Sequence, residues 1–168
     1  MTGIYTRVKK VAAHAGLLAI VLLLVGCNEG FRPRAAVGDR VPASENRLPA
    51  TPEAWREVCT MNTPDRLHTE RIASLVQNGR PFMVVFGTPQ HCTMCVDQLV
   101  RIAVLKEKYE DRFAFVHVDG YMDNAIWVEW GVTGEPWTFI VDRTGVVSAV
   151  FPGPTDNAVM EAAIEKVL

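Results

Sequence analysis

The sequence predicts an α/β domain in which a mixed central β-sheet is flanked by helices on both faces. Two observations predict this class. Short continuous apolar runs, which are typical of strands covered on both faces, alternate with longer segments of helical periodicity. In addition, a strand–helix–strand unit is followed by a strand pair and a closing helix, an order that places parallel and antiparallel neighbours in one sheet.

The first half of the domain is predicted to form a helix, a strand and a second helix. Thr63 suits an N-cap, Pro64 the first helical position and Gly79 the end, so we expect a helix over 63–78. The apolar run over 81–87 predicts a buried strand. The helix that follows the cysteines is expected to face inward with Val96, Leu99, Val100, Ala103, Val104 and Tyr109.

The second half is predicted to form a strand, a short helix, a hairpin and a last helix. The strand covers 113–119, and the helix over 122–131 is closed by Gly131. Two strands joined by the turn Arg-Thr-Gly make the hairpin over 136–151. The last helix is capped by Thr155 or Asp156. Its inward positions are Val159, Ala162, Ala163, Ile164 and Val167.

The N-terminus has the order of an export signal. Three basic residues without an acid precede an apolar run that ends at Gly26, shorter than a membrane span requires. The end of this run, Leu24-Val25-Gly26-Cys27, resembles a bacterial lipobox. The resemblance implies a signal peptide over 1–26, cleavage before Cys27 and lipid on Cys27. We therefore expect a lipid-anchored protein whose domain faces the periplasm or the cell exterior.

Composition divides the remaining chain into a tether and one domain. Residues 27–52 combine several prolines with scattered charges and little apolar periodicity, so we expect a flexible tether there and a domain over 53–168. Loss of residues 1–26 changes the net charge from −2 to −5, because that segment holds three basic residues and no acid. An acidic chain without a basic run among aromatics is not expected to bind nucleic acid.

Three stretches, over about residues 55–168, resemble the thioredoxin-like family. In "MVVFGTPQHCTMC" a strand leads into a CxxC pair that opens a helix. In "VEWGVTGEPWTFIVD" a short helix, a glycine and a proline precede a strand, and "GVVSAVF" is its hairpin partner. The resemblance implies a thioredoxin-like fold in which Pro136 follows a cis bond and lies against the disulfide.

The chain departs from the common thioredoxin pattern around the cysteines. His91 stands where tryptophan is common, Thr93-Met94 replaces Gly-Pro, and the strand over 81–87 lacks the acid that many members hold below the pair. Glu135 could replace that acid if it points at the cysteines, or it could be a solvated loop residue. Trp137 is a candidate to line a substrate groove beside Pro136.

The expected chemistry is thiol–disulfide exchange without a cofactor. Cys92 at a helix start would be the nucleophile, because unpaired N–H groups and the helix dipole favour the thiolate. Protonated His91 would favour it further, and Cys95, one turn on, would resolve the mixed disulfide. The expected partners are protein thiols and disulfides of the cell envelope, an upstream redox partner, and the membrane through the lipid anchor.

Three alternatives stay open at this stage. The pair could bind Cu(I) together with His91 and Met94, as a thioredoxin-fold copper chaperone would. It could be an inert structural disulfide, or the domain could bind partners without turnover. Of the other candidate ligands, His117 is expected to be a satisfied core histidine, His68 to lie on the solvent side of a helix and Cys59 to be buried. A four-ligand zinc site is disfavoured, because the chain has no second CxxC and no paired histidines.

Overall fold

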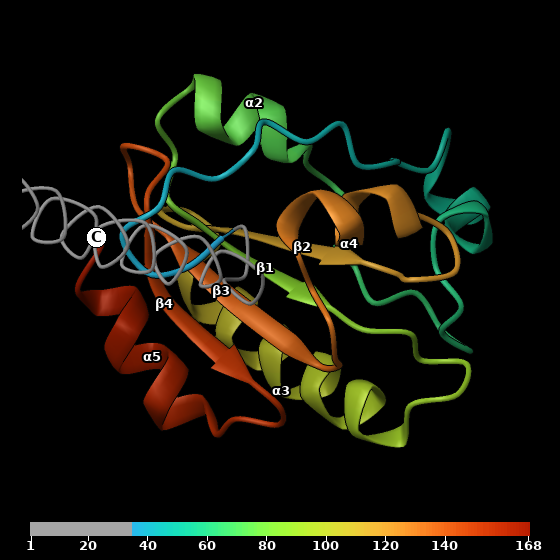
Figure 1. Cartoon of the computed structure of the whole chain (residues 1–168). Helices are drawn as coiled ribbons and strands as arrows, with labels where there is room; N and C mark the ends of the chain where they lie inside the picture. Colours follow the sequence, from blue (N-terminus) through green and yellow to red (C-terminus); the bar gives the residue numbers. More distant parts are fainter. Residues whose placement is uncertain (1–34) are drawn as a thin grey trace, which may run out of the picture. The chain divides into compact units, whose positions relative to one another are not determined.

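The computed structural model describes residues 35–168 (Figure 1). The predicted signal peptide over 1–26 and the predicted lipid site at Cys27 lie outside the described residues. In chain order the elements are the 3₁₀ helix η1 (Pro52–Glu57), α2 (Ile72–Gln77), β1 (Phe82–Phe86), α3 (Thr93–Tyr109), β2 (Ala114–Val118), α4 (Asn124–Trp130), β3 (Trp137–Val141), β4 (Val147–Pro152) and α5 (Asn157–Glu165). Among these, no helix is both long enough and apolar enough to span a bilayer.

The predicted mixed sheet is confirmed. Its strand order is β2-β1-β3-β4, so β1 occupies a central position. β1 runs parallel to β2 and antiparallel to β3, and β3 and β4 form the expected hairpin. Because β1 and β2 are parallel, their carboxyl ends lie at the same edge of the sheet, and this edge carries the cysteine pair.

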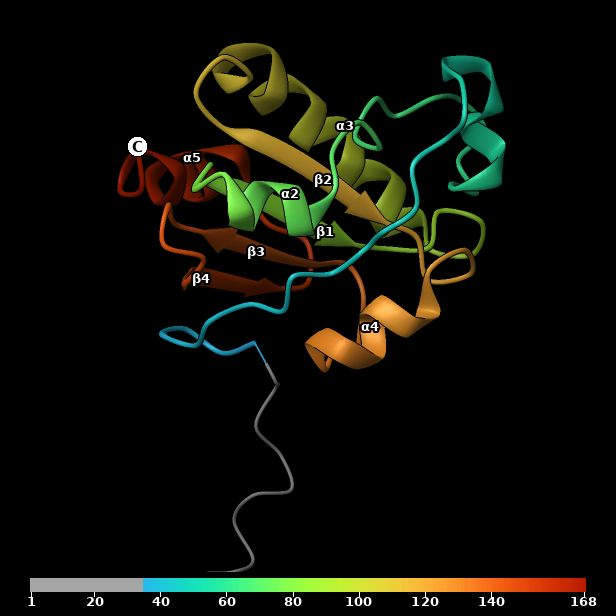
Figure 2. The ribbon, with the colours of Figure 1, turned by 90° about the horizontal axis from the view of Figure 1, so that it is seen from above.

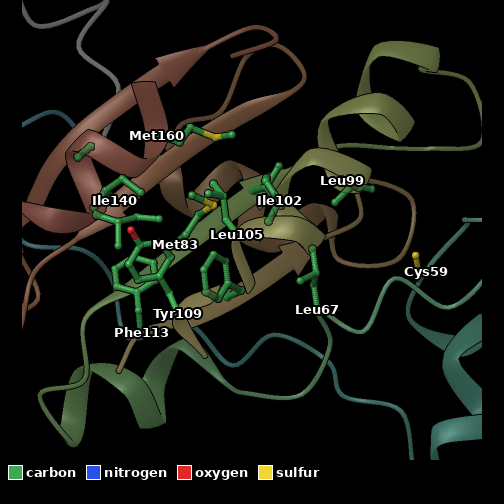
Figure 3. Packing of buried hydrophobic residues seen from close by; sticks show 14 of the residues in the cluster. Cys59, Leu67, Met83, Leu99, Ile102, Leu105, Tyr109, Phe113, Ile140 and Met160 are labelled. Atoms are coloured by element: carbon green, nitrogen blue, oxygen red, sulfur yellow. The ribbon is translucent and has the colours of Figure 1, made fainter. Parts of the chain in front are cut away.

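Helices cover both faces of this sheet, as predicted. Figures 1 and 2 show α3 and α5 on one face and α2 and α4 on the other. Alternate residues of β1 serve the two faces: Met83 and Val85 pack on the α3 side, and Phe82, Val84 and Phe86 on the α4 side. Figure 3 shows the first of these clusters, in which Leu99, Ile102 and Leu105 meet the strand residues. All five residues of β1 are buried, which explains its continuous apolar run.

Helix α3 begins where the sequence predicts, but its buried face is displaced from the predicted one. The buried positions are Cys95, Gln98, Leu99, Ile102, Leu105 and Tyr109. Val100 and Val104, which were expected to face inward, are 58% and 59% exposed. Each lies two residues from Ile102, or about 200° around the helix, so both point away from the sheet once Ile102 faces it. The apolar stripe alone did not fix the helix orientation.

The helix predicted over 63–78 is wrong in its first half. Only Ile72–Gln77 is helical, and Arg66 has a φ of +59°, which a helix does not allow. The Asp65 carboxylate accepts a hydrogen bond from the Leu67 N–H at 3.0 Å and turns the chain inward. His68 is consequently buried and does not face solvent as expected.

The flexible tether predicted over 27–52 is wrong for the residues that the structure describes. Residues 38–41 run beside the start of β4, where the Gly38 N–H donates to the Val147 carbonyl at 2.9 Å. Buried Asn46 accepts from the Ile72 N–H at 2.8 Å and donates to the Glu70 carbonyl at 3.1 Å. These bonds satisfy the first turn of α2, so a polar, proline-rich segment is ordered by hydrogen bonding to distant parts of the chain.

The second half follows the prediction closely. Gly131 ends α4 with a φ of +69°, and the Asp142 carboxylate holds the hairpin turn by accepting from the Thr144 and Val146 N–H groups at 2.8 and 3.0 Å. Partial burial would raise the pKa of Asp142, but these hydrogen bonds outweigh it and lower that pKa. In α5 the buried residues are Met160, Ala163 and Ile164, whereas Val159, expected inside, is exposed.

Candidate functional site

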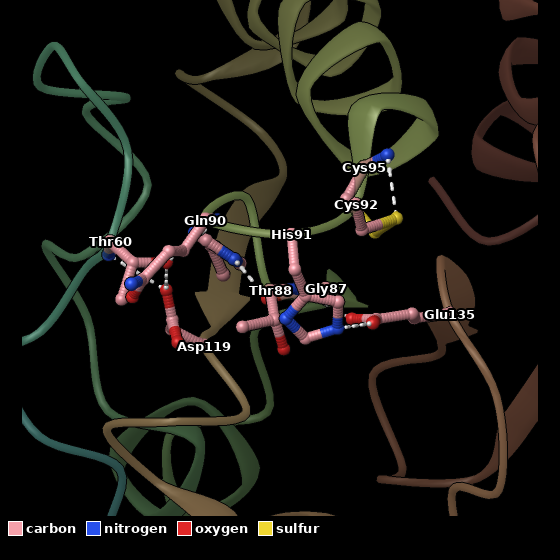
Figure 4. The surroundings of a disulfide bond; sticks show 10 residues. Thr60, Gly87, Thr88, Gln90, His91, Cys92, Cys95, Asp119 and Glu135 are labelled. Atoms are coloured by element: carbon pink, nitrogen blue, oxygen red, sulfur yellow. Dashed lines mark hydrogen bonds and ion pairs between the residues drawn. A yellow bond between two sulfur atoms is a disulfide. The ribbon is translucent and has the colours of Figure 1, made fainter.

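Cys92 and Cys95 form a disulfide at the start of α3, with their Cα atoms 5.2 Å apart (Figure 4). Cys92 is the N-cap of the helix, and its sulfur accepts from the Cys95 N–H at 3.1 Å. Cys92 retains 8% exposure and Cys95 none. The sulfur nearer to solvent is therefore the one that also lies at the positive end of the helix.

The local fold at the pair depends on the turn that follows β1. The Thr88 carbonyl accepts from the N–H groups of His91 and Cys92 at 3.2 and 3.1 Å, which closes a tight turn into α3. Gly87 lies directly against the helix, because a Cβ there would be 3.1 Å from Cys95 Cβ and 3.3 Å from its sulfur. Only glycine permits this close approach without a shift of the helix.

Glu135 points at the cysteines, which decides between the two alternatives left open for it. One carboxylate oxygen accepts from the Thr88 N–H at 2.6 Å, and the other lies 2.6 Å from His91 Nε2. A carboxylate oxygen and both sulfurs all lie within 4.8 Å of one another. The Glu135 side chain is 18% exposed. A partly buried carboxylate thus reaches the disulfide from a loop, not from the strand below it.

The predicted cis bond between Glu135 and Pro136 is confirmed. The Pro136 carbonyl accepts from the Gly153 N–H at 2.7 Å, which joins this loop to the end of β4. Trp137 follows at the start of β3 and packs on the α4 face of the sheet, 6.2 Å from the Phe139 ring. Its contacts are therefore on the face opposite α3, and those described do not include the disulfide.

Two exposed side chains lie close to the cysteines, one by sequence and one through His91. Met94 and Tyr121 are 53% and 61% exposed, and the Tyr121 ring lies 5.2 Å from the His91 ring. Among the predicted copper ligands, the two sulfurs come together, but of the His, Cys, Asp and Glu side chains in the described residues the third donor that converges on them is Glu135 and not His91. His91 is engaged by Glu135 instead.

A hydrogen-bond network next to the cysteine turn was not predicted. Asp119 is buried and accepts from the N–H and the hydroxyl of Thr60 at 2.7 and 2.6 Å. The Thr60 hydroxyl in turn accepts from the Gln90 N–H at 3.2 Å, next to the cysteine turn (Figure 4). The position of Asp119 directly after β2 was a usable signal, since parallel strands end at the same edge of the sheet.

His117 is a satisfied core histidine, as predicted. It is 1% exposed in β2, and its Nε2 donates to the Gly87 carbonyl at 3.0 Å. Cys59 is buried and free, also as predicted. What the sequence did not indicate is that Cys59, Asp65 and His68 all lie beside His117, since Asp65 and His68 come from a segment that was expected to be helical and Cys59 precedes it.

Comparisons with known proteins agree with this architecture. A sequence profile of the thioredoxin-like domain matches residues 69–168. The thioredoxin NaTrxh from Nicotiana alata is 20% identical with a TM-score of 0.50, and the match covers 56% of this chain and 80% of that one. For the thioredoxin of Fasciola hepatica the identity is 21% and the TM-score 0.48, with 54% and 84% covered. No curated protein matches the chain significantly.

Proposed function

The chain belongs to the thioredoxin-like domain family, and on this premise we propose that it is a thiol–disulfide oxidoreductase that works outside the cytoplasm while tethered to a membrane. A thioredoxin-like domain with a cysteine pair able to form a disulfide indicates thiol–disulfide chemistry in general. The observation that carries the redox part of the proposal is the Cys92–Cys95 disulfide at the start of α3, within reach of the Glu135 carboxylate.

The first step of the proposed reaction is attack by Cys92. In the reduced protein, the N-cap position offers its sulfur the free N–H groups of the first helical turn, which favours the thiolate. The thiolate attacks one sulfur of a substrate disulfide and breaks that S–S bond. The other substrate sulfur leaves as a thiolate and takes a proton from water, and a mixed disulfide joins Cys92 to the substrate.

The second step is resolution by Cys95. The Cys95 thiol gives its proton to the Glu135 carboxylate, directly or through one water, and its sulfur attacks Cys92. The mixed disulfide breaks, the substrate leaves as a second thiol, and the Cys92–Cys95 disulfide forms. The substrate has gained two electrons that the protein has lost, and an upstream redox partner returns them. The same steps in reverse oxidise a dithiol.

The surroundings of Cys92 support a protein as the substrate. Met94, which lies between the two cysteines in sequence, and Tyr121, whose ring lies 5.2 Å from the His91 ring, both expose apolar surface. Such surface can pack against a peptide that brings its disulfide to Cys92, whereas a small thiol would leave it in water. The proposed partners are therefore thiols and disulfides of cell-envelope proteins.

Copper handling at the same pair is the second candidate. The observation in its favour is the convergence of two sulfurs and one carboxylate within 4.8 Å. A carboxylate suits Cu(I) poorly, since that ion prefers thiolate and thioether ligands. Titration of the reduced protein with Cu(I) distinguishes the two functions, because a chaperone would bind one ion tightly through Cys92 and Cys95.

The location is proposed from the sequence of residues 1–27. The basic start, the apolar run and the lipobox-like end at Cys27 support export and lipid attachment. The domain would then lie at the outer side of a bacterial inner membrane or at another envelope membrane. Residues 35–51 are hydrogen-bonded to the domain and are therefore not part of a free tether.

Cys95→Ser should convert the protein into a trap for its substrates. Removal of the resolving thiol leaves the mixed disulfide on Cys92 without an internal route of release. We expect disulfide-linked adducts on non-reducing gels of envelope extracts, sensitive to reductant. Cys92→Ser/Cys95→Ser is the matched control and should form none. Absence of adducts in Cys95→Ser, together with no turnover of a peptide disulfide by the wild type, would refute the enzymatic proposal.

Glu135→Gln should slow resolution and leave attack unchanged. The amide keeps an acceptor for the Thr88 N–H but cannot take a proton, so we expect release from the mixed disulfide to slow by about 100-fold, the lower end for loss of an acid–base group. Stopped-flow measurement of the two phases with a peptide disulfide checks this. Glu107→Gln, at an exposed position of α3, is the control. Equal release rates in all three proteins would remove Glu135 from the mechanism.

Cys27→Ala should abolish lipid attachment. The wild type is expected to incorporate labelled fatty acid in a bacterial host and to sediment with membranes. The variant should remain unprocessed or be released, because no other residue offers the lipobox-like position. Fatty-acid labelling that persists in Cys27→Ala would disprove the anchor while leaving the chemistry of the domain untouched.

A further inference from the structure

A second group of chemically reactive side chains lies outside the disulfide site. Cys59 follows η1, Asp65 and His68 belong to the irregular loop before α2, and His117 lies in β2. One donor atom from each of the four residues lies within 4.8 Å of the other three. All four side chains are buried or nearly so, with exposed fractions of 7% or less. The proposed redox mechanism uses none of them.

The distances between these donors are close to the edges of a tetrahedron around a metal ion. His68 Nε2 lies 3.1 Å from His117 Nδ1 and 3.4 Å from Asp65 Oδ2. The Cys59 sulfur lies 3.6 Å from Asp65 Oδ2 and 3.8 Å from His117 Nδ1. Zinc bonds of about 2.0 Å to nitrogen and about 2.3 Å to sulfur give tetrahedral edges of about 3.3 and 3.5 Å. Two distances are shorter than these edges: the His68–His117 distance of 3.1 Å by a small amount, and the Asp65–His117 contact of 2.5 Å, which would have to open.

Each of three donors is oriented by a further hydrogen bond. His117 Nε2 donates to the Gly87 carbonyl at 3.0 Å, which leaves the Nδ1 lone pair facing the cluster in the neutral ring. Asp65 Oδ1 accepts from the Leu67 N–H at 3.0 Å and so turns Oδ2 inward. The Cys59 sulfur accepts from the Met61 N–H at 3.4 Å. Outer partners of this kind fix the ligands of metal sites.

The four donor atoms face one small buried region. His117 Nδ1, His68 Nε2 and the Cys59 sulfur lie 2.5, 3.4 and 3.6 Å from the single oxygen Asp65 Oδ2. His68 Nε2 and the Cys59 sulfur also lie 3.1 and 3.8 Å from His117 Nδ1. One cation at their centre would take a lone pair from each of the four donors at once, with Cys59 as the thiolate.

We propose that Cys59, Asp65, His68 and His117 form a structural zinc site. The donor set of one thiolate, two imidazoles and one carboxylate is one that Zn²⁺ accepts, and four protein ligands leave no position for a reacting water. A cavity of about 610 Å³ is lined in part by Asp65, His68 and Trp55 and gives an ion a route from solvent. The site goes beyond the proposed redox function and does not depend on it.

The absence of paired motifs in the sequence disfavoured a four-ligand zinc site, and the proposed site contains no such motif. The four ligands come from three separate segments, and only the Asp65–His68 pair is close in sequence. Arg66 between them has a φ of +59°, a conformation uncommon for arginine, and it lets both neighbours face the cluster. An ion there would fasten the irregular loop over 58–71 to β2, beside the strand end that carries the disulfide.

Titration of the oxidised full chain with Co²⁺, a spectroscopic substitute for Zn²⁺, tests the proposal. With Cys92 and Cys95 joined in a disulfide and Cys27 replaced by alanine, only Cys59 can give the thiolate-to-cobalt absorption band in the near ultraviolet. We expect that band and tetrahedral visible bands to saturate at one equivalent, and Zn²⁺ to displace the Co²⁺. The wild type purified without added metal should contain zinc by elemental analysis.

Matched variants locate the ion. Cys59→Ser should lose the ultraviolet band and bind Co²⁺ at least about 100-fold more weakly. Loss of a residue that only hydrogen-bonds to a metal ligand costs up to about 100-fold, so loss of a ligand itself should cost at least as much. His68→Gln, at the cavity side of the cluster, should lose a similar amount of Co²⁺ affinity. If circular dichroism shows that Cys59→Ser does not fold, the Co²⁺ affinity of His68→Gln tests the proposal in its place. Cys92→Ser/Cys95→Ser and His91→Gln should bind as the wild type does. Folded wild type that binds neither ion, unchanged binding in both ligand variants, or binding lost in Cys92→Ser/Cys95→Ser would overturn the proposal.

Discussion

The close contact between Gly87 and Cys95 is the constraint on which the rest of the site depends. A Cβ at Gly87 would lie 3.1 Å from the Cys95 Cβ, so α3 can keep its close distance to the end of β1 without a shift only because a glycine follows the strand. The carbonyl of the same residue accepts from His117 Nε2 in the neighbouring strand. One residue thus sets the position of the disulfide and ties it to the buried cluster of Cys59, Asp65, His68 and His117. A single peptide group therefore connects that cluster to the residue that contacts Cys95.

The carboxylate at this site comes from an unusual direction for the family the sequence resembles. The strand below the cysteines offers no acid, because all five residues of β1 are buried apolar side chains. Glu135 takes that place from the loop before Pro136, held by the Thr88 N–H and by His91. Its side chain is partly exposed, so in the proposed mechanism a proton taken from Cys95 would pass on to solvent without crossing the core. We regard this as the main chemical difference from a common thioredoxin site.

Much of the fold could be predicted from the sequence, because its signals are local. The apolar run of β1, the Gly131 helix end and the turn at Asp142 each act within a few residues. Cys92 and Cys95 were found by spacing, and Glu135 and Pro136 by their place before a strand. The residue types of these elements and the period of their apolar residues are therefore enough to predict them.

The errors fall where distant hydrogen bonds decide the structure. Asn46 starts α2 from 26 residues away, so neither the order of residues 35–51 nor the true beginning of that helix was visible locally. His68 was placed on a solvent face because Pro64 and Gly79 suggested one continuous helix, whereas Asp65 turns the chain inward. The cluster around His117 could not be found from spacing, since its members meet only in the folded chain.

The reduction potential of the Cys92–Cys95 pair tests the central claim most directly. The full chain would be equilibrated in glutathione or dithiothreitol buffers of known potential, its thiols alkylated, and the two-thiol fraction measured by mass. We predict a single two-electron transition between about −270 and −120 mV, the span of thioredoxin-like and disulfide-exchange catalysts. A potential below about −300 mV, where structural disulfides lie, would contradict the account and indicate that the pair is a structural disulfide.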